Sequence, residues 1–179
     1  MSKTRRLLKT KETTRQALST LDPTTTRKKM SDIPSQTRWL LIAANAFASI
    51  FIAFGVNAIF RPANGLSFFE FPHAAPITAA SSKEAKAAAQ QDAKVIDALM
   101  AIYGVRDIFM GVAIYAATYF SSANDRSVLG YILIATSAVA FADGVICAAH
   151  KTGAEWNHWG YAPIIAGVGA TLLGVFDPK

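Results

Sequence analysis

Five ionisable side chains lie within or beside long apolar stretches, where charge is rare: Arg106, Asp107, Asp143, Glu155 and His158. Burial in an apolar bundle and pairing with an arginine both change how strongly a carboxylate holds its proton, so such groups can donate or accept one. We therefore predict that Asp107, Asp143 and Glu155 are candidate catalytic acid–base groups. Arg106 would orient an anionic or carbonyl oxygen of a substrate, and His158 would lie at the mouth of the site.

The same charges have a purely structural interpretation. An Arg or Asp at the centre of a membrane helix costs about 2.5–3.5 kcal/mol, so these residues normally face the bundle interior and pair with one another. A pair between Arg106 and Asp143, or between Arg106 and Asp107, would then only hold the helices in register. The residues alone leave both interpretations open.

Metal and cofactor chemistry find little support in the sequence. His73, His150 and His158, with Asp143 and Glu155, supply ligand atoms, but they show none of the short spacings typical of metal sites. The chain also has no nucleophile elbow, phosphate-binding loop or dinucleotide fingerprint. We therefore predict no metal and no cofactor.

Four apolar stretches have the length and composition of membrane spans, at about residues 39–60, 95–120, 128–149 and 159–175. The first has 22 residues and no charge. At 1.5 Å per residue it would reach about 33 Å, enough for a hydrocarbon core of about 30 Å. The second qualifies only if Arg106 and Asp107 lie inside the bundle. We predict an all-α fold, a four-transmembrane-helix bundle over residues 39–176.

The composition agrees with a lipid environment. Of the 179 residues, 52% are hydrophobic and only 17% are charged, and the mean hydropathy is +0.27. Soluble domains usually carry about 25% charged residues. A soluble all-helical protein with a large core is the alternative, but the apolar residues here form long blocks rather than amphipathic stripes.

The basic character of the chain comes from its first 38 residues. They contain ten Lys or Arg and three acidic residues, a net charge of +7, which leaves −1 for the remainder. Residues 1–38 are polar and contain no aromatic side chain, so we predict a disordered basic tail that binds no nucleic acid. The positive-inside rule places this tail in the cytoplasm, and its charge suits anionic lipid heads. A mitochondrial presequence is a minor alternative.

The predicted topology gathers the polar residues. The segment 61–94 and the segment 150–158 would lie outside, with aromatics of the first part of 61–94 at the membrane surface and its Ala-rich second part as an exposed helix or flexible loop. The outer half of the bundle would then contain Asn57, Arg106, Asp107, Asp143, His150, Glu155 and His158.

Four stretches carry a resemblance to a known family: NGLSFFEFP, LMAIYGVRDIFMGVAIYAA, GYILIATSAVAFADGVICAAH and EWNHWGYAP. Over about residues 40–176 the chain resembles small fungal integral membrane proteins that are grouped as a domain of unknown function. The resemblance implies four spans and names no reaction. Some similar proteins occur in fungal secondary-metabolite gene clusters, which implies a role with lipophilic small molecules.

Two functional hypotheses follow. The first is a multi-pass membrane enzyme or accessory subunit that acts on a lipophilic small molecule, in an endomembrane or the plasma membrane. The second is a non-catalytic scaffold or partner-binding subunit, in which the buried charges are structural. The lipid bilayer is the expected partner in both, and a membrane partner protein is a further candidate.

Overall fold

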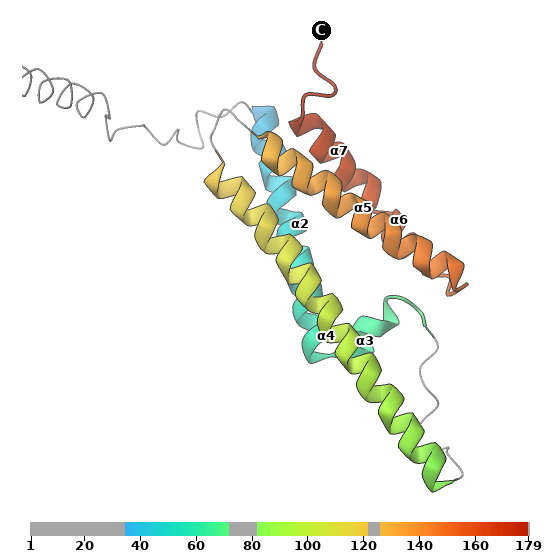
Figure 1. The fold of residues 1–179 in the computed structure, drawn as a ribbon. Coiled ribbons are helices and arrows are strands. Elements are labelled where there is room, and N and C mark those ends of the chain that lie inside the picture. Colours follow the sequence, from blue (N-terminus) through green and yellow to red (C-terminus); the bar gives the residue numbers. More distant parts are fainter. Residues whose placement is uncertain (1–34, 72–81, 122–125, 179) are drawn as a thin grey trace, which may run out of the picture. The chain divides into compact units, whose positions relative to one another are not determined.

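The computed structural model describes residues 35–71, 82–121 and 126–178, and every regular element in these ranges is a helix. In chain order the helices are α2 (Ser35–Phe60), α3 (Pro62–Ser67), α4 (Lys83–Phe120), α5 (Ser127–Ala149), α6 (Glu155–Trp159) and α7 (Ala162–Leu172) (Figure 1). The predicted all-α class is confirmed for this part of the chain. The predicted tail lies outside the described residues as far as residue 34.

Two helices contain a segment long and apolar enough to cross a membrane, judged by length and composition. These segments are Thr37–Phe60 in α2 and Ser127–Ala149 in α5. Only 28% and 33% of the most apolar stretch of each is buried inside the protein. The core helix of a soluble protein would be mostly buried, so most of this apolar surface needs another environment.

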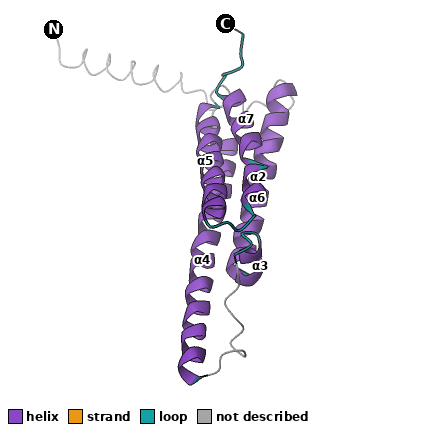
Figure 2. Cartoon of the chain, turned by 90° about the vertical axis from the view of Figure 1, so that its right-hand side faces the viewer, coloured by secondary structure: helices purple, strands orange, loops and turns teal. Residues whose placement is uncertain are grey.

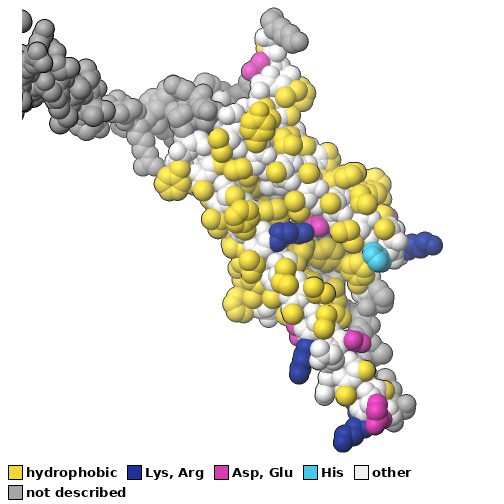
Figure 3. Space-filling view, viewed as in Figure 1, with side chains coloured by type: hydrophobic (Ala, Val, Ile, Leu, Met, Phe, Trp, Pro, Cys, Tyr) yellow, Lys and Arg dark blue, Asp and Glu magenta, His cyan; other side chains and the backbone are white. Residues whose placement is uncertain are grey.

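Large apolar side chains are exposed on other helices as well. Examples on α4 are Ile102, Phe109 and Phe120, which are between 67% and 89% exposed. The space-filling view shows a face that is mainly apolar, with a basic and an acidic side chain lying together near its middle (Figure 3). Such extensive apolar surface is unusual for a monomeric soluble protein.

Helix α4 begins much earlier than the predicted second span. The Ser82 hydroxyl caps it by accepting a hydrogen bond from the backbone N–H of Ala85 at 3.1 Å. The strong helix formers of the Ala-rich segment continue without a break into the apolar stretch, so the segment that starts at residue 95 is the second part of a 38-residue helix. This helix is about 57 Å long, and its first part extends beyond the other helices (Figures 1 and 2).

The predicted fourth span is interrupted in the structure. Helix α6 ends at Trp159, Gly160 and Tyr161 form a turn, and α7 begins at Ala162. Pro163 lies in the first turn of α7, where the missing N–H costs nothing, but it could not continue a preceding helix. Helix α7 ends at Leu172, shortly before Gly174, which has a φ of +73°.

Glycines bring α2 and α4 together as an antiparallel pair. A Cβ on Gly104 would lie 2.5 Å from the carbonyl oxygen of Gly55, and a Cβ on Gly111 would lie 2.6 Å from that of Ala48. Only a residue without a side chain allows the two backbones to approach this closely. The two contacts therefore fix the register of α2 against α4.

Helices α5 and α7 form a second antiparallel pair by the same means. A Cβ on Gly169 would lie 2.9 Å from the carbonyl oxygen of Gly130. Further along, the Ser137 hydroxyl donates a 2.7 Å hydrogen bond to the carbonyl oxygen of Ala162. This bond ties the start of α7 to α5.

The two helix pairs touch each other much less than the helices within each pair do. One link is the edge-on contact between the rings of Phe51 on α2 and Tyr161, whose centroids are 6.5 Å apart. Another is an ion pair between α4 and α5. The candidate functional site lies at this second link.

Candidate functional site

A bidentate ion pair joins α4 to α5. Nη1 of Arg106 donates to Oδ1 of Asp143 at 3.0 Å, and Nη2 donates to Oδ2 at 2.8 Å. Nη2 also donates to Oδ1 of Asp107 at 3.3 Å. Asp107 is 1% exposed and Asp143 is 7% exposed, whereas the Arg106 side chain keeps 35% of its surface. These three side chains, which we call the ion cluster, have a formal charge of −1.

Two aromatic rings support the ion cluster. Tyr103 lies one helical turn before Arg106, and its ring centroid is 4.2 Å from the guanidinium carbon, a cation–π contact. Phe69 packs edge-on against Tyr103, with the ring centroids 5.0 Å apart. The guanidinium is therefore held by carboxylates at its edge and by an aromatic ring at its face.

An open groove of about 450 Å³ runs beside the ion cluster, among the α3 segment, α4 and α5. This volume lies within the range of small-molecule sites. Its charged lining residues are Arg106 and Asp143. The rest of the lining is apolar or aromatic and comprises Leu66, Phe69, Phe71, Ile96, Leu99, Met100, Tyr103 and Ile146. The groove therefore offers an apolar binding surface with a charged group at one place.

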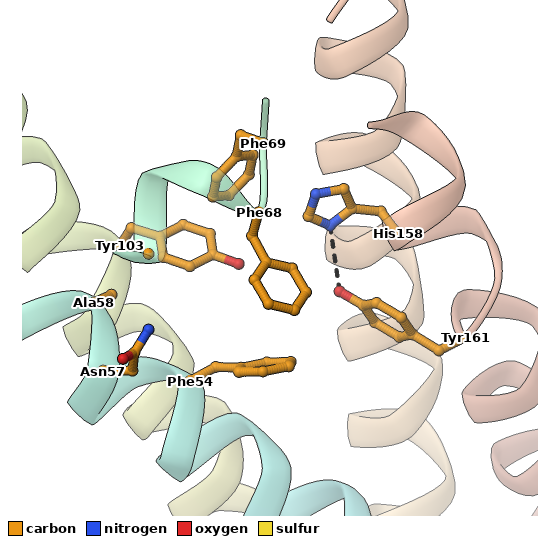
Figure 4. Close-up of a pocket in the computed structure, with 9 residues that line it drawn as sticks. Phe54, Asn57, Ala58, Phe68, Phe69, Tyr103, His158 and Tyr161 are labelled. Atoms are coloured by element: carbon orange, nitrogen blue, oxygen red, sulfur yellow. Dashed lines mark hydrogen bonds between the residues drawn. The ribbon is translucent and has the colours of Figure 1, made fainter. Parts of the chain in front are cut away.

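A second, smaller space of about 20 Å³, the small cavity, lies on the other side of Tyr103 and Phe69. It is large enough for one water molecule. Figure 4 shows His158 and Tyr161 on one side of this cavity and Tyr103 on the other. Tyr103 and Phe69 line both spaces, so they form the wall between the groove and the cavity.

His158 is the buried polar residue of the small cavity, 2% exposed. Its Nδ1 is 3.3 Å from the hydroxyl oxygen of Tyr161, and its ring packs on Phe69 with the centroids 5.0 Å apart. Nε2 has no hydrogen-bond partner among the described residues. Burial lowers the pKa of His158 below its usual value, so the imidazole is held in its neutral form.

Two amide side chains fix the short helices around this cavity. Asn157 on α6 donates from Nδ2 to the carbonyl oxygen of Phe68 at 3.0 Å. Asn57 on α2 donates from Nδ2 to Oδ1 of Asn64 on α3 at 2.9 Å. These bonds hold the segment that contains Phe69, which in turn positions the wall between the two spaces.

The structure brings three of the five predicted site residues into direct contact: Arg106, Asp107 and Asp143. Both pairings that the sequence left open, with Asp107 and with Asp143, are present. Glu155 begins α6 and is half-buried, and within the described part of the chain Arg106 donates no hydrogen bond to it. His158 lies inside the small cavity rather than at an open mouth. The catalytic roles of these residues stay predictions.

Two further polar residues were expected near the site. Asn57 lines the small cavity. His150 follows the end of α5, is exposed, and packs edge-on against Phe71 with the ring centroids 5.7 Å apart. In the described ranges no three His, Cys, Asp or Glu side chains come together as metal ligands, and His73 lies outside those ranges.

Sequence reasoning missed the aromatic residues that line the two spaces. Tyr103 and Phe69 line both, and Tyr161 lines the small cavity. Tyr103 had a usable signal, because positions three apart on a helix are neighbours and Arg106 follows at that spacing. Tyr161 lies three residues after His158, the same spacing, and the two side chains are in hydrogen-bond contact. Phe69 had no local signal, since its partners come from α4 and α6.

The fold and the site define an all-helical protein with two helices apolar enough to cross a membrane and a charged cluster beside an apolar groove. The chain belongs to the family described as "Domain of unknown function (DUF4267)", whose match covers residues 48–172. This match contains α4 and α5 entirely and therefore the whole ion cluster. Neither the curated proteins nor the solved structures contain a match.

Proposed function

We propose that the protein is a multi-pass membrane protein that binds a lipophilic small molecule in the groove beside Arg106 and Asp143, as an enzyme or as an accessory subunit of one. The observation that carries the proposal is the groove, an apolar and aromatic surface with an ion cluster beside it. A lipophilic molecule dissolved in the bilayer would reach it without crossing water. The resemblance to fungal membrane proteins favours secondary metabolism as the setting.

Four spans suit the structure better than two. The later part of α4 lies antiparallel to α2 along its apolar segment, and α7 lies antiparallel to α5. If α2 and α5 cross the membrane, their partners have the same depth. Arg106 and Asp107 lower the hydropathy of α4. The ion pairs of Arg106 with Asp107 and Asp143 reduce the free-energy cost of placing these charges in a membrane. Helix α7 is about 16 Å long, and residues 159–161 before it and 173–175 after it would complete the predicted fourth crossing.

The basic residues before α2 favour a cytoplasmic N-terminus. With four spans the α3 segment, the start of α4 and α6 then lie on the outer side. The groove, which Phe71 and Ile96 border, would open towards that side. An endomembrane or the plasma membrane fits this orientation.

The proposed chemistry is proton transfer by the carboxylates of the ion cluster. Asp143 lines the groove directly, so it would donate or accept the proton of a bound substrate. Asp107 is almost fully buried behind Arg106 and would tune the charge of the cluster. Glu155 and His158 lie on α6 and do not line the groove, so they would act only on a larger ligand.

Filling the groove tests the binding proposal. Leu99 lines the groove and is 58% exposed, whereas Val105 on the same helix is 61% exposed and does not line it. After deletion of the gene, lipid extracts should show a changed lipophilic metabolite, and the V105W variant should restore the normal profile. L99W should accumulate equally well but fail to restore it. Full restoration by L99W would disprove the role of the groove.

The conservative Asp143→Asn variant tests the chemistry. Asparagine keeps a hydrogen-bond acceptor for Arg106 but cannot take up a proton at neutral pH. The enzyme hypothesis predicts that D143N accumulates and fails to restore the metabolite profile. If D143N accumulates normally and restores the profile fully, the catalytic role of Asp143 is excluded.

A structural role for the ion cluster is the second candidate function, in which the protein is a scaffold or partner-binding subunit. It is favoured by the position of the bidentate pair, which is one of few contacts between the two helix pairs. In that case Asp143→Asn and Arg106→Gln should lower the amount of folded protein in proportion to any loss of function.

A further inference from the structure

We infer that the groove selects a lipophilic cation, a molecule with an apolar body and a protonated amine at its polar end. The inference rests on the proposed function of the groove as a ligand site. It narrows that proposal because the sequence suggested the opposite ligand, one with an anionic or carbonyl oxygen held by Arg106.

The first argument is the charge of the ion cluster. Two carboxylates, Asp107 and Asp143, face a single guanidinium, so the cluster lacks one positive charge. An uncompensated charge is costly where the surroundings are apolar. A cation bound beside Asp143 would complete the cluster, whereas an anion would add to the excess.

The second argument is that Arg106 has little left to offer an anion. Both terminal nitrogens already donate to Asp143, and Nη2 donates to Asp107 as well. Nε is buried and makes no hydrogen bond in the described residues. The bidentate geometry by which arginine recognises a carboxylate is therefore occupied by the protein itself. Asp143, in contrast, has acceptor positions to spare, because each carboxylate oxygen carries two lone pairs.

The third argument is the aromatic lining. Phe69, Phe71 and Tyr103 line the groove together with Asp143. The faces of aromatic rings attract organic cations, and rings combined with a carboxylate are a common way to bind an ammonium group. The aliphatic residues Leu99 and Ile146 lie on opposite helices of the same groove and suit a hydrocarbon chain.

Three probes with the same chain test the inference: dodecylamine, dodecanol and dodecanoate. At pH 7 they are cationic, neutral and anionic. Each is titrated into the full chain in nanodiscs of zwitterionic lipid, and the increase in melting temperature reports binding. The L99W variant supplies the background from partition into lipid. We expect dodecylamine to bind at least about ten-fold more tightly than dodecanoate, with dodecanol between them.

The outcomes separate the inference from the proposed function. If none of the three probes gives a shift that L99W abolishes, the groove is not a ligand site and the proposed function fails. If dodecanol or dodecanoate binds through the groove as tightly as dodecylamine, the groove is a ligand site but the charge preference is wrong. If dodecylamine binds most tightly and L99W removes this binding, the result supports both the ligand site and its charge preference.

A second variant should reverse the charge preference of the groove. Ile146 lines the groove and is 50% exposed, so a lysine there can be accommodated without disturbing the core. The I146K variant places a cation in the groove and should lose dodecylamine binding while it gains dodecanoate binding. An unchanged order of the three probes in folded I146K would overturn the inference.

Discussion

The Arg106 guanidinium is fixed by three side chains, two carboxylates and one aromatic ring. Asp143 holds it across the interface between α4 and α5, Asp107 holds it from the same helix, and the Tyr103 ring lies under it. Removal of one partner from such a cluster leaves the others with an unbalanced charge. The three side chains should therefore act as a unit in stability.

A double-mutant cycle measures this coupling. Arg106→Gln leaves two carboxylates without a counter-charge and should destabilise the protein by up to about 3 kcal/mol, because the guanidinium is partly screened by solvent. Adding Asp143→Asn should recover part of that loss. Unfolding of the single and double variants in detergent checks the prediction, and strictly additive effects would contradict it.

The buried imidazole of His158 makes stability depend on pH. Burial lowers its pKa below the value of 6.5 that it has when unfolded, so the unfolded chain takes up a proton more readily than the folded protein. The stability that depends on neutral His158 is present above about pH 6.5 and is lost as the pH falls below it. Melting temperatures between pH 8 and 5 should therefore decrease towards the acidic end.

The variant His158→Phe should reduce this decrease, since phenylalanine keeps the ring and cannot be protonated. His150→Gln is the matched control, because it removes an exposed histidine that lies outside the small cavity. Equal profiles for the wild type and H158F would exclude His158 as the titrating group.

At the residue scale, the sequence predicted the ion cluster because charges in apolar stretches must find partners. The sequence analysis identified all three members of the cluster: Arg106 and Asp107, which are adjacent on α4, and Asp143, which is 37 positions from Arg106. The aromatic residues were harder, since an aromatic side chain in an apolar context has many suitable neighbours and only the fold selects one. His158 was placed at a mouth because the sequence does not reveal that Phe69 covers it.

At the scale of elements, glycine and proline decide how the helices meet. Gly104 and Gly55 allow close contact of α2 with α4, and Gly169 with Gly130 does the same for α5 and α7. At each contact a Cβ added to the glycine would meet a backbone carbonyl oxygen of the facing helix, so a change there acts on the backbones themselves.

Gly104→Ala should separate α2 from α4. The new Cβ would meet the carbonyl oxygen of Gly55 at 2.5 Å, and a backbone atom cannot move aside as a side chain can. We expect a loss of stability of about 1–3 kcal/mol. Gly167→Ala is the control, because no atom lies within 4 Å of the added Cβ, and it should be neutral or stabilising by up to about 1 kcal/mol. Thermal unfolding in detergent compares the two, and equal melting temperatures would refute close packing at Gly104.

The helices themselves were largely predictable, but their ends were not. Long apolar stretches predicted α2 and α5 almost to their bounds. The start of α4 was missed because Ala, Lys and Glu favour a helix whether or not it is in a membrane, so hydropathy does not mark where a helix begins. The break before α7 follows from Pro163, whose effect was not considered.

At the scale of the whole molecule, the described helices form two antiparallel pairs with the site between them. The groove and the ion cluster both need α4 from one pair and α5 from the other. Binding at the groove therefore depends on how the two pairs are assembled, which makes ligand-dependent stability a measure of assembly.

Reporter fusions test the proposed topology. Fusions after Lys94 and after Lys151 should report the outer side, and a fusion after Ser122 should report the cytoplasm. The first two positions lie at the outer ends of the predicted spans, and the third lies at the inner end. If the first two reported the cytoplasm, the site would lie on the inner side and could not take up ligands from outside.

The position of Arg106 and Asp143 on successive helices has a consequence for biosynthesis. Arg106 leaves the ribosome 37 residues before Asp143, an interval of roughly 2–7 s at common elongation rates. During this time Asp107 is the carboxylate already present beside it. If α4 crosses the membrane as proposed, the adjacent Asp107 would balance the charge of Arg106 until α5 is made. Asp107 would then serve as a temporary counter-ion during translation.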